Sequence, residues 1–168
     1  FSCPKVTGEI GASLGNWKYL NDVVGQYKSE NQTTPTVTDT LFIKDLKVAD
    51  APQAQIAYAI TAFPIQGLMV RAQGRSYWKH FADFQAVDRT NRNDIGIQSW
   101  EAPGYTVFDI HASYRLGDLI PAFGGGDVRI FTHVYNLFDE LYVSDAVDNS
   151  RYNGFDKDHD ADDAEIYL

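Results

Sequence analysis

Residues 105–116 read Tyr-Thr-Val-Phe-Asp-Ile-His-Ala-Ser-Tyr-Arg-Leu, and this stretch decides the fold class. From Phe108 to Leu116 an apolar or aromatic residue stands at every second position, and the residues between them are polar or charged. A period of two predicts a β-strand, because successive side chains leave opposite faces of the pleat. One face of this strand is therefore apolar, and the other meets water.

Four more stretches alternate in the same way and are predicted as strands, at residues 6–19, 54–63, 68–78 and 128–136. Only Pro-Ile-Gln-Gly, at 64–67, separates the stretch at 54–63 from the stretch at 68–78, which predicts an antiparallel hairpin. Residues 41–48 also alternate and are interpreted as the upper part of a strand. Two interpretations remain open at this point: an ordinary half-buried sheet and the wall of a membrane β-barrel.

The lengths of the predicted loops favour the barrel. Long polar loops are predicted near 21–40, 84–103 and 144–165, whereas the turn at 64–67 is short. Up-and-down barrels of the outer membrane have short turns at one end and long loops at the other. We therefore expect the three long loops to lie at the same end of the strands.

Residues 134–142, Val-Tyr-Asn-Leu-Phe-Asp-Glu-Leu-Tyr, resemble the penultimate barrel strand of TonB-dependent outer-membrane receptors, where Asn-Leu-Phe-Asp followed by Tyr is a landmark. Residues 105–114 are similar to the preceding strand of that family, and residues 156–165 to the last extracellular loop of some members. The resemblance implies an all-β fold of antiparallel up-and-down strands that form part of a 22-stranded transmembrane β-barrel. Residues 1–168 would be its C-terminal segment, with about five strands, without the plug domain and without at least one final strand.

The resemblance also implies a function, which is TonB-energised uptake of a scarce nutrient across the outer membrane of a Gram-negative bacterium. The nutrient classes are siderophore, haem, cobalamin, saccharide and peptide. The implied partners are the rest of the barrel and its plug, the TonB complex acting through the plug, and outer-membrane lipid. No catalytic motif stands out, so no enzyme activity is expected. The alternatives are a soluble, surface-exposed β-domain with a calcium-stabilised acidic loop, and a passive porin.

Strand parity divides the candidate residues between two faces. Side chains expected to face lipid are Ile56, Tyr58, Ile60, Phe108, Ile110, Ala112, Val128, Ile130 and Val134. Side chains expected to face the lumen, where they line a substrate path or form a charge network, are Arg71, Arg75, Asp109, His111, Arg115, Arg129 and His133. The two histidines fall on neighbouring strands, but two ligands do not make a closed zinc site.

The acidity of the chain is local. The formal net charge is −9, and residues 139–165 hold ten carboxylates against Arg151 and Lys157, which argues against nucleic acid as a partner. Asp156, Asp158 and Asp160 have the spacing that opens a calcium loop, but Ala161 stands where an EF-hand has Gly and no Glu closes the loop. Candidate Ca²⁺ ligands in another loop geometry are Asp156, Asp158, Asp160, Asp162 and Asp163; the alternative is a solvated acidic loop.

The chain is rich in aromatic residues, with 10 Tyr, 10 Phe and 3 Trp. This composition favours strands and interfacial belts. Belt positions are predicted for Trp17, Tyr58, Trp78 and Tyr114. Cys3 is the one cysteine and is interpreted as a small apolar residue.

Overall fold

The computed structural model describes residues 5–27, 37–85, 89–116, 128–148 and 164–167. Within these residues the protein is all-β, with mainly antiparallel pairing and a short 3₁₀ turn at Arg92–Asp94. The chain divides into two compact units. The first unit comprises Phe1–Leu14, Ala54–Tyr77 and Gly104–Leu141, and the second comprises Gly15–Gln53, Trp78–Pro103 and Tyr142–Leu168.

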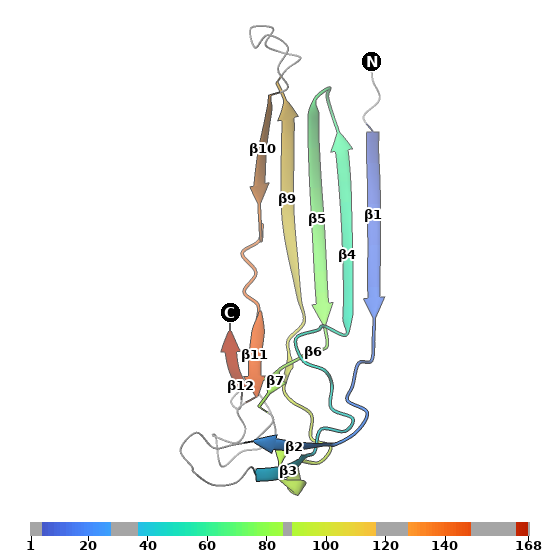
Figure 1. The fold of residues 1–168 in the computed structure, drawn as a ribbon. Coiled ribbons are helices and arrows are strands. Elements are labelled where there is room, and N and C mark those ends of the chain that lie inside the picture. The colour runs from blue at the N-terminus through green and yellow to red at the C-terminus, as the bar shows by residue number, and fades with distance from the viewer. Residues whose placement is uncertain (1–4, 28–36, 86–88, 117–127, 149–163, 168) are drawn as a thin grey trace. The chain divides into compact units, whose positions relative to one another are not determined.

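The first unit is a five-stranded antiparallel sheet of long strands (Figure 1). Its strands, in spatial order, are β1 (Lys5–Leu14), β4 (Ala54–Phe63), β5 (Leu68–Trp78), β9 (Tyr105–Arg115) and β10 (Arg129–Val134). The described strands form an open sheet, with β1 and β10 at its edges. All three long loops leave the same end of this sheet, because the strands alternate in direction.

The all-β prediction is confirmed, and the strands predicted at 54–63 and 68–78 have the observed bounds. The first predicted strand, 6–19, was too long, because β1 ends at Leu14. Beyond it, the Trp17 carbonyl accepts a hydrogen bond from Val48 N, and Tyr19 N donates to Leu46 O. These bonds tie residues 15–19 to a loop of the second unit rather than to a strand of the sheet.

Gly67 makes the tight turn between β4 and β5 possible. Its φ of +81° lies in the left-handed region, which side chains with a Cβ rarely adopt. A Cβ at this position would also lie 3.0 Å from the Arg115 carbonyl oxygen. The close approach serves pairing, because Arg115 N donates to Gly67 O at 2.9 Å.

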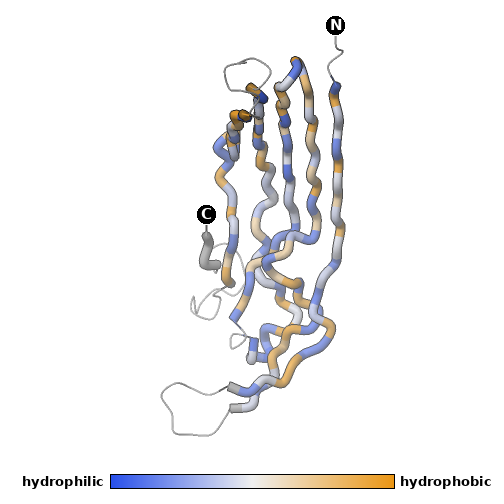
Figure 2. The backbone as a smooth tube through the Cα atoms, turned by 45° about the horizontal axis from the view of Figure 1, so that its top comes forward, coloured by the Kyte–Doolittle hydropathy of each residue, from blue (hydrophilic) through white to orange (hydrophobic). Residues whose placement is uncertain are grey.

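The register of the sheet separates its two faces. Paired residues in neighbouring strands point to the same side, and the pairs include Ile10 with Tyr58 and Ala72 with Ile110. All nine side chains expected to share a face do so, with Val128 following the parity of β10 through the Leu116 N to Val128 O bond. The alternation is visible along the strands in Figure 2. We call this side the apolar face and the other the polar face.

A row of aromatic rings crosses the apolar face at mid-strand. Tyr58 lies over Gly74 so closely that a Cβ on the glycine would clash with its ring. The Tyr58 ring reaches Phe108 edge-on, with centroids 6.0 Å apart. Tyr58 is therefore not at a strand end, where an interfacial belt would place it. Its ring instead fills the space that Gly74 leaves, a known way to support glycine in a sheet.

The second unit contains short strands that the sequence did not predict, because each is only two to five residues long. β2 (Val23–Tyr27) pairs with β3 (Val37–Leu41), and β6 (His80–Phe81) pairs with β8 (Glu101–Ala102). β11 (Asp145–Asp148) lies between β12 (Ala164–Tyr167) and β7 (Asp83–Phe84), parallel to the latter. The predicted long loops therefore carry regular pairing.

Leu41 ends β3, but residues 42–48 form a folded loop, so the interpretation of residues 41–48 as the upper part of a strand was wrong. Leu46 is fully buried, and Ile43 is nearly so. Gln98 holds the loop from both sides, because its side chain accepts from Lys47 N and donates to Asp45 O, each at 2.9 Å. The alternation in this stretch reflects a loop with two buried apolar residues rather than a pleat.

Three aspartates of the second unit interact unfavourably. Partial burial, followed by the charges of Asp145 and Asp83, raises the pKa of Asp50 above its usual value. A hydrogen bond with Asp145 acts in the same direction, whereas the charge of His80 opposes it. A carboxyl whose pKa is higher in the folded chain favours folding at acid pH, and this contribution is lost as the pH rises.

Asp50→Asn is therefore expected to stabilise the protein at pH 7, by roughly 0.5–1 kcal/mol for an exposed group. Asparagine keeps the shape and tolerates the φ of +58° at this position. As the pH rises above about 4, the free energy of unfolding should also fall less in the variant than in the unmodified protein. Denaturant unfolding of both proteins at pH 4, 5.5 and 7 measures this. If the two proteins differ in free energy of unfolding by the same amount at all three pH values, the aspartates do not repel one another as described.

Candidate functional site

The polar face of the sheet brings together all seven residues expected to line a lumen. Register pairs Arg71 with His111, Arg115 with Arg129, and His111 with His133. Asp109 and Arg75 follow on the same side of β9 and β5. Several less polar side chains share this face, namely Met69, Val107 and Phe131.

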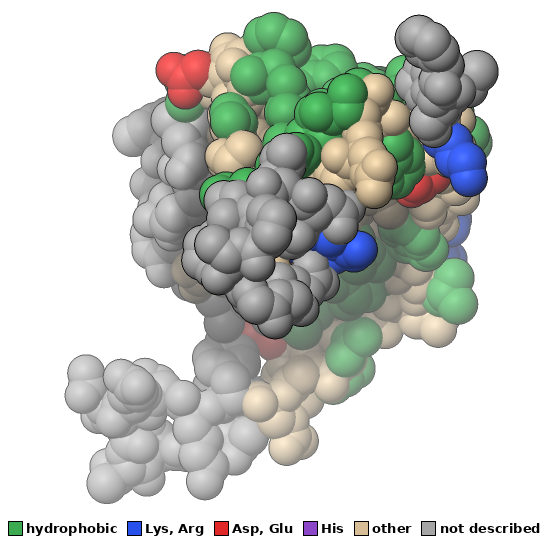
Figure 3. Space-filling view, turned by 90° about the horizontal axis from the view of Figure 1, so that it is seen from above, with side chains coloured by type: hydrophobic (Ala, Val, Ile, Leu, Met, Phe, Trp, Pro, Cys, Tyr) green, Lys and Arg blue, Asp and Glu red, His purple; other side chains and the backbone are tan. Residues whose placement is uncertain are grey.

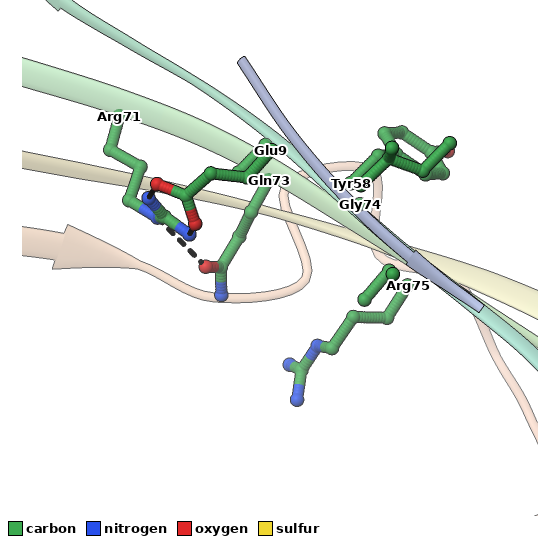
Figure 4. Close-up of a pocket in the computed structure, with 10 residues that line it drawn as sticks. Glu9, Tyr58, Arg71, Gln73, Gly74 and Arg75 are labelled. Carbon is green, nitrogen blue, oxygen red and sulfur yellow. Dashed lines mark hydrogen bonds and ion pairs between the residues drawn. The ribbon is translucent and has the colours of Figure 1, made fainter. Parts of the chain in front are cut away.

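Arg71 is the centre of the first ion pair on this face. Its Nη1 and Nη2 donate to the two carboxylate oxygens of Glu9 at 2.8 and 3.0 Å (Figure 4). Nη1 also donates to Thr61 Oγ1 at 3.2 Å, and Nε donates to the Gln73 side chain at 3.3 Å. Two parallel bonds between a guanidinium and a carboxylate fix orientation as well as charge. This pair therefore joins β1 to β5 across β4.

A shallow hollow of about 330 Å³ lies next to this pair. Small residues, Gly11, Ala57 and Ala59, line it together with the polar side chains of Glu9, Arg71, Gln73 and Arg75. A second hollow, of about 350 Å³, lies near the turn and is lined in part by Ser113, Arg115 and Arg129. Both hollows open onto the polar face, where water and small polar solutes have access to charged groups.

Asp109 is the most deeply buried charged group of this face, at 1% exposure. Its Oδ2 accepts from Arg75 Nη2 at 2.8 Å and from Gln73 Nε2 at 3.0 Å. Its Oδ1 accepts from Asn136 N at 3.0 Å. A buried carboxylate is tolerated when charge and hydrogen bonds compensate its lost hydration, and here three donors do so.

Asn136 begins the Asn-Leu-Phe-Asp segment and turns the chain at the end of β10. Its φ of +48° is left-handed, a conformation that asparagine adopts more readily than most residues. The side chain closes a loop with Glu140, by accepting from Glu140 N and donating to Glu140 O, both at 2.9 Å. The motif therefore has a structural role in this chain.

The same segment is also fixed from the apolar face. Leu137 N donates to Phe108 O at 2.7 Å. The Phe138 ring meets Phe108 edge-on, with centroids 5.3 Å apart. The adjacent residues Phe108 and Asp109 thus hold residues 136–138 from opposite sides of β9. We call this arrangement the β9 clamp.

The predicted calcium site cannot be placed, because it falls outside the part of the chain that the structure describes. The five candidate calcium ligands, Asp156, Asp158, Asp160, Asp162 and Asp163, are outside the described residues. Among the residues that are described, no group of three or more His, Cys, Asp and Glu side chains is arranged to hold a metal ion. In the same part of the chain, no helix has the length and apolar character needed to cross a membrane.

Sequence reasoning missed several members of the polar network. Glu9 and Gln73 fall at polar-face positions of their strands, so the alternation of the sequence was enough to identify them. Asn136 was part of the family landmark, but its bonds to Asp109 and Glu140 depend on a turn that periodicity does not predict. Thr61 was missed because threonine is common in any strand.

Comparison with protein-family models, with curated proteins and with solved structures found no match for this chain.

The β9 clamp predicts an ordered effect of substitutions at Asn136. Asn136→Ala loses both side-chain bonds to Glu140 and puts alanine in a left-handed conformation that asparagine tolerates better, so it should cost about 2–4 kcal/mol. Asn136→Gly loses the same bonds without that strain and should cost about 1–2 kcal/mol. Denaturant unfolding of the full-length protein measures the difference. Equal losses for the two variants would show that the turn is not a constraint.

Proposed function

We propose that this chain forms part of the wall of an outer-membrane β-barrel, in a receptor that takes up a scarce nutrient with energy supplied through TonB. The nutrient is a siderophore, haem, cobalamin, a saccharide or a peptide. In this proposal the sheet is the wall, the three long loops are extracellular, and a plug supplies the moving part. The observation that carries the proposal is the apolar face of the sheet.

That face carries no charged side chain in any of the five described strands. Many of its large side chains are exposed, among them Ile10 at 81%, Leu14 at 83% and Ile60 at 61%. The space-filling view looks along the strands from above rather than onto this face, and it shows hydrophobic side chains interspersed with polar ones (Figure 3). A contiguous apolar surface of this extent is unfavourable in water, and lipid is the solvent that suits it.

Strand length supports the same environment. β1 and β4 have 10 residues each, and β5 and β9 have 11 each. Tilted strands of about 9–11 residues cross the hydrocarbon core of a bilayer. One pair of hydroxyl groups on the apolar face is satisfied within the sheet, because Ser76 and Thr106 bond each other at 2.8 Å. In a bilayer the free edges of β1 and β10 would require further strands.

The polar face suits the inside of such a barrel. The polar face holds Glu9 and Asp109 in ion pairs with arginines. Its hollows give water access to Glu9 and to several of the arginines, whereas Asp109 stays buried. A lumen needs polar side chains on alternate positions of every strand. The β9 clamp adds an ordered exit from β10 beside the middle of β9. The family resemblance of residues 134–142 supplies the TonB-dependent part of the proposal.

Topology in intact cells tests this proposal. Ile65, in the short turn, and Ile95, in a long loop, are exposed to similar extents, 59% and 57%. Each is replaced by cysteine in a Cys3→Ser background of the full-length protein, expressed in a Gram-negative host. A bulky maleimide that does not cross the outer membrane should label Ile95→Cys in intact cells, and should label Ile65→Cys only after permeabilisation.

Labelling of Ile65→Cys alone in intact cells would invert the topology, and equal labelling of both would exclude a membrane-spanning wall. Recovery of the protein in the soluble fraction would favour the surface-exposed β-domain instead. Deletion of TonB in the host separates an energised receptor from a passive porin, because flux through a porin needs no TonB.

A further inference from the structure

Two histidine side chains face each other across β9 and β10 on the polar face. His111 and His133 are directly paired in the register. Their Nδ1 atoms are 2.6 Å apart, and their ring centroids are 4.9 Å apart. In the contact between these atoms one nitrogen donates and the other accepts, so at least one ring is unprotonated at Nδ1. Two imidazole nitrogens therefore converge on one point in space.

The separation of these atoms is close to what a shared metal ion needs. Imidazole nitrogen binds zinc at about 2.0–2.1 Å, which puts two ligands about 2.9 Å apart at a right angle and about 3.3 Å apart in a tetrahedron. Opening the pair by less than about 1 Å meets either geometry, within the reach of small side-chain rotations. The β-strands themselves do not have to move.

The surroundings hold both rings in place. The Tyr135 ring stacks on His133, with centroids 6.0 Å apart, and meets His111 edge-on at 5.7 Å. On the other side of His133 lies Phe131, at 5.6 Å between centroids. Aromatic neighbours on both sides restrict the rotation of the His133 ring, so the pair is largely organised before any ion binds.

The charges near the pair do not oppose a cation. Arg71, which is paired with His111 in the register, carries a positive charge. The Glu9 carboxylate balances this charge, because both terminal nitrogens of Arg71 donate to it. The Asp109 carboxylate, two residues from His111, is engaged by Arg75 and Gln73. His133 itself is exposed. Water therefore has access to the remaining coordination positions of a bound ion.

We propose that His111 and His133 form an open binding site for a borderline divalent transition-metal ion such as Cu²⁺ or Zn²⁺. Imidazole suits these ions, and Cu²⁺ has the highest affinity among first-row divalent metals for a given set of nitrogen ligands. With two protein ligands and water in the other positions, the site exchanges its ion readily, unlike a structural zinc site. The inference does not depend on the chain spanning a membrane.

The test uses Cu²⁺ alone, added to the full-length protein with His159→Gln, which removes the histidine within the acidic segment. Electron paramagnetic resonance at one equivalent should show two nitrogen ligands. His111→Gln and His133→Gln should each leave at most one nitrogen at this site and raise the Kd at least tenfold. The protein with His159→Gln alone is the matched control, and its two-nitrogen signal should equal that of the unmodified protein.

A second measurement needs no substitution at the pair. Zn²⁺ should protect His111 and His133, but not the other histidines, from modification by diethylpyrocarbonate, as read by mass spectrometry. The proposal is overturned if the double variant His111→Gln/His133→Gln keeps the two-nitrogen signal and the same Kd. It is equally overturned if the unmodified protein binds Cu²⁺ through oxygen ligands alone, or if Zn²⁺ leaves both rings open to modification.

Discussion

The alternation of side chains along five paired strands is the constraint on which the sheet depends. Because the period is two, a shift of one residue in any pairing would move charged side chains to the apolar face. The observed register avoids this in every described pair, so Arg71, Asp109 and His111 lie together and Ile60, Ala72 and Ile110 lie together. Separation of the two faces also sets the register, since the ion pairs and aromatic contacts form in that alignment alone.

The β9 clamp extends this logic beyond the strands. Phe108 and Asp109 are consecutive, so their side chains point to opposite faces, and each holds part of the segment after β10. Both contacts follow directly on Asn136, whose left-handed backbone turns the chain at the end of β10. A buried carboxylate thus has a stabilising role through hydrogen bonds that its burial makes necessary. The sheet, the turn and the polar network are one cooperative arrangement.

Much of the sheet was predictable from the sequence, because hydrophobic alternation is a direct consequence of pleated geometry. Strands β4 and β5, the Gly67 turn and both sets of facing residues follow from parity alone. The second unit was not predictable in the same way. Its strands are too short for a period to emerge. Its buried residues, such as Leu46 and Arg89, lie in loops that distant residues hold, because Tyr19 N donates to Leu46 O and Phe42 N donates to Arg89 O. Tyr58 was misplaced in a belt because composition does not reveal that its ring covers Gly74.

In the proposed barrel, lipid would contact the apolar face and water would contact the polar face. Spin labels placed singly along β9, from residue 107 to residue 114, in the full-length protein in vesicles test it most directly. Collisions with oxygen, which concentrates in lipid, should be high at 108, 110, 112 and 114, and collisions with a water-soluble nickel chelate should be high at the positions between them. Uniform access of the nickel chelate to all eight positions, or the opposite phase, would show that lipid does not cover the apolar face.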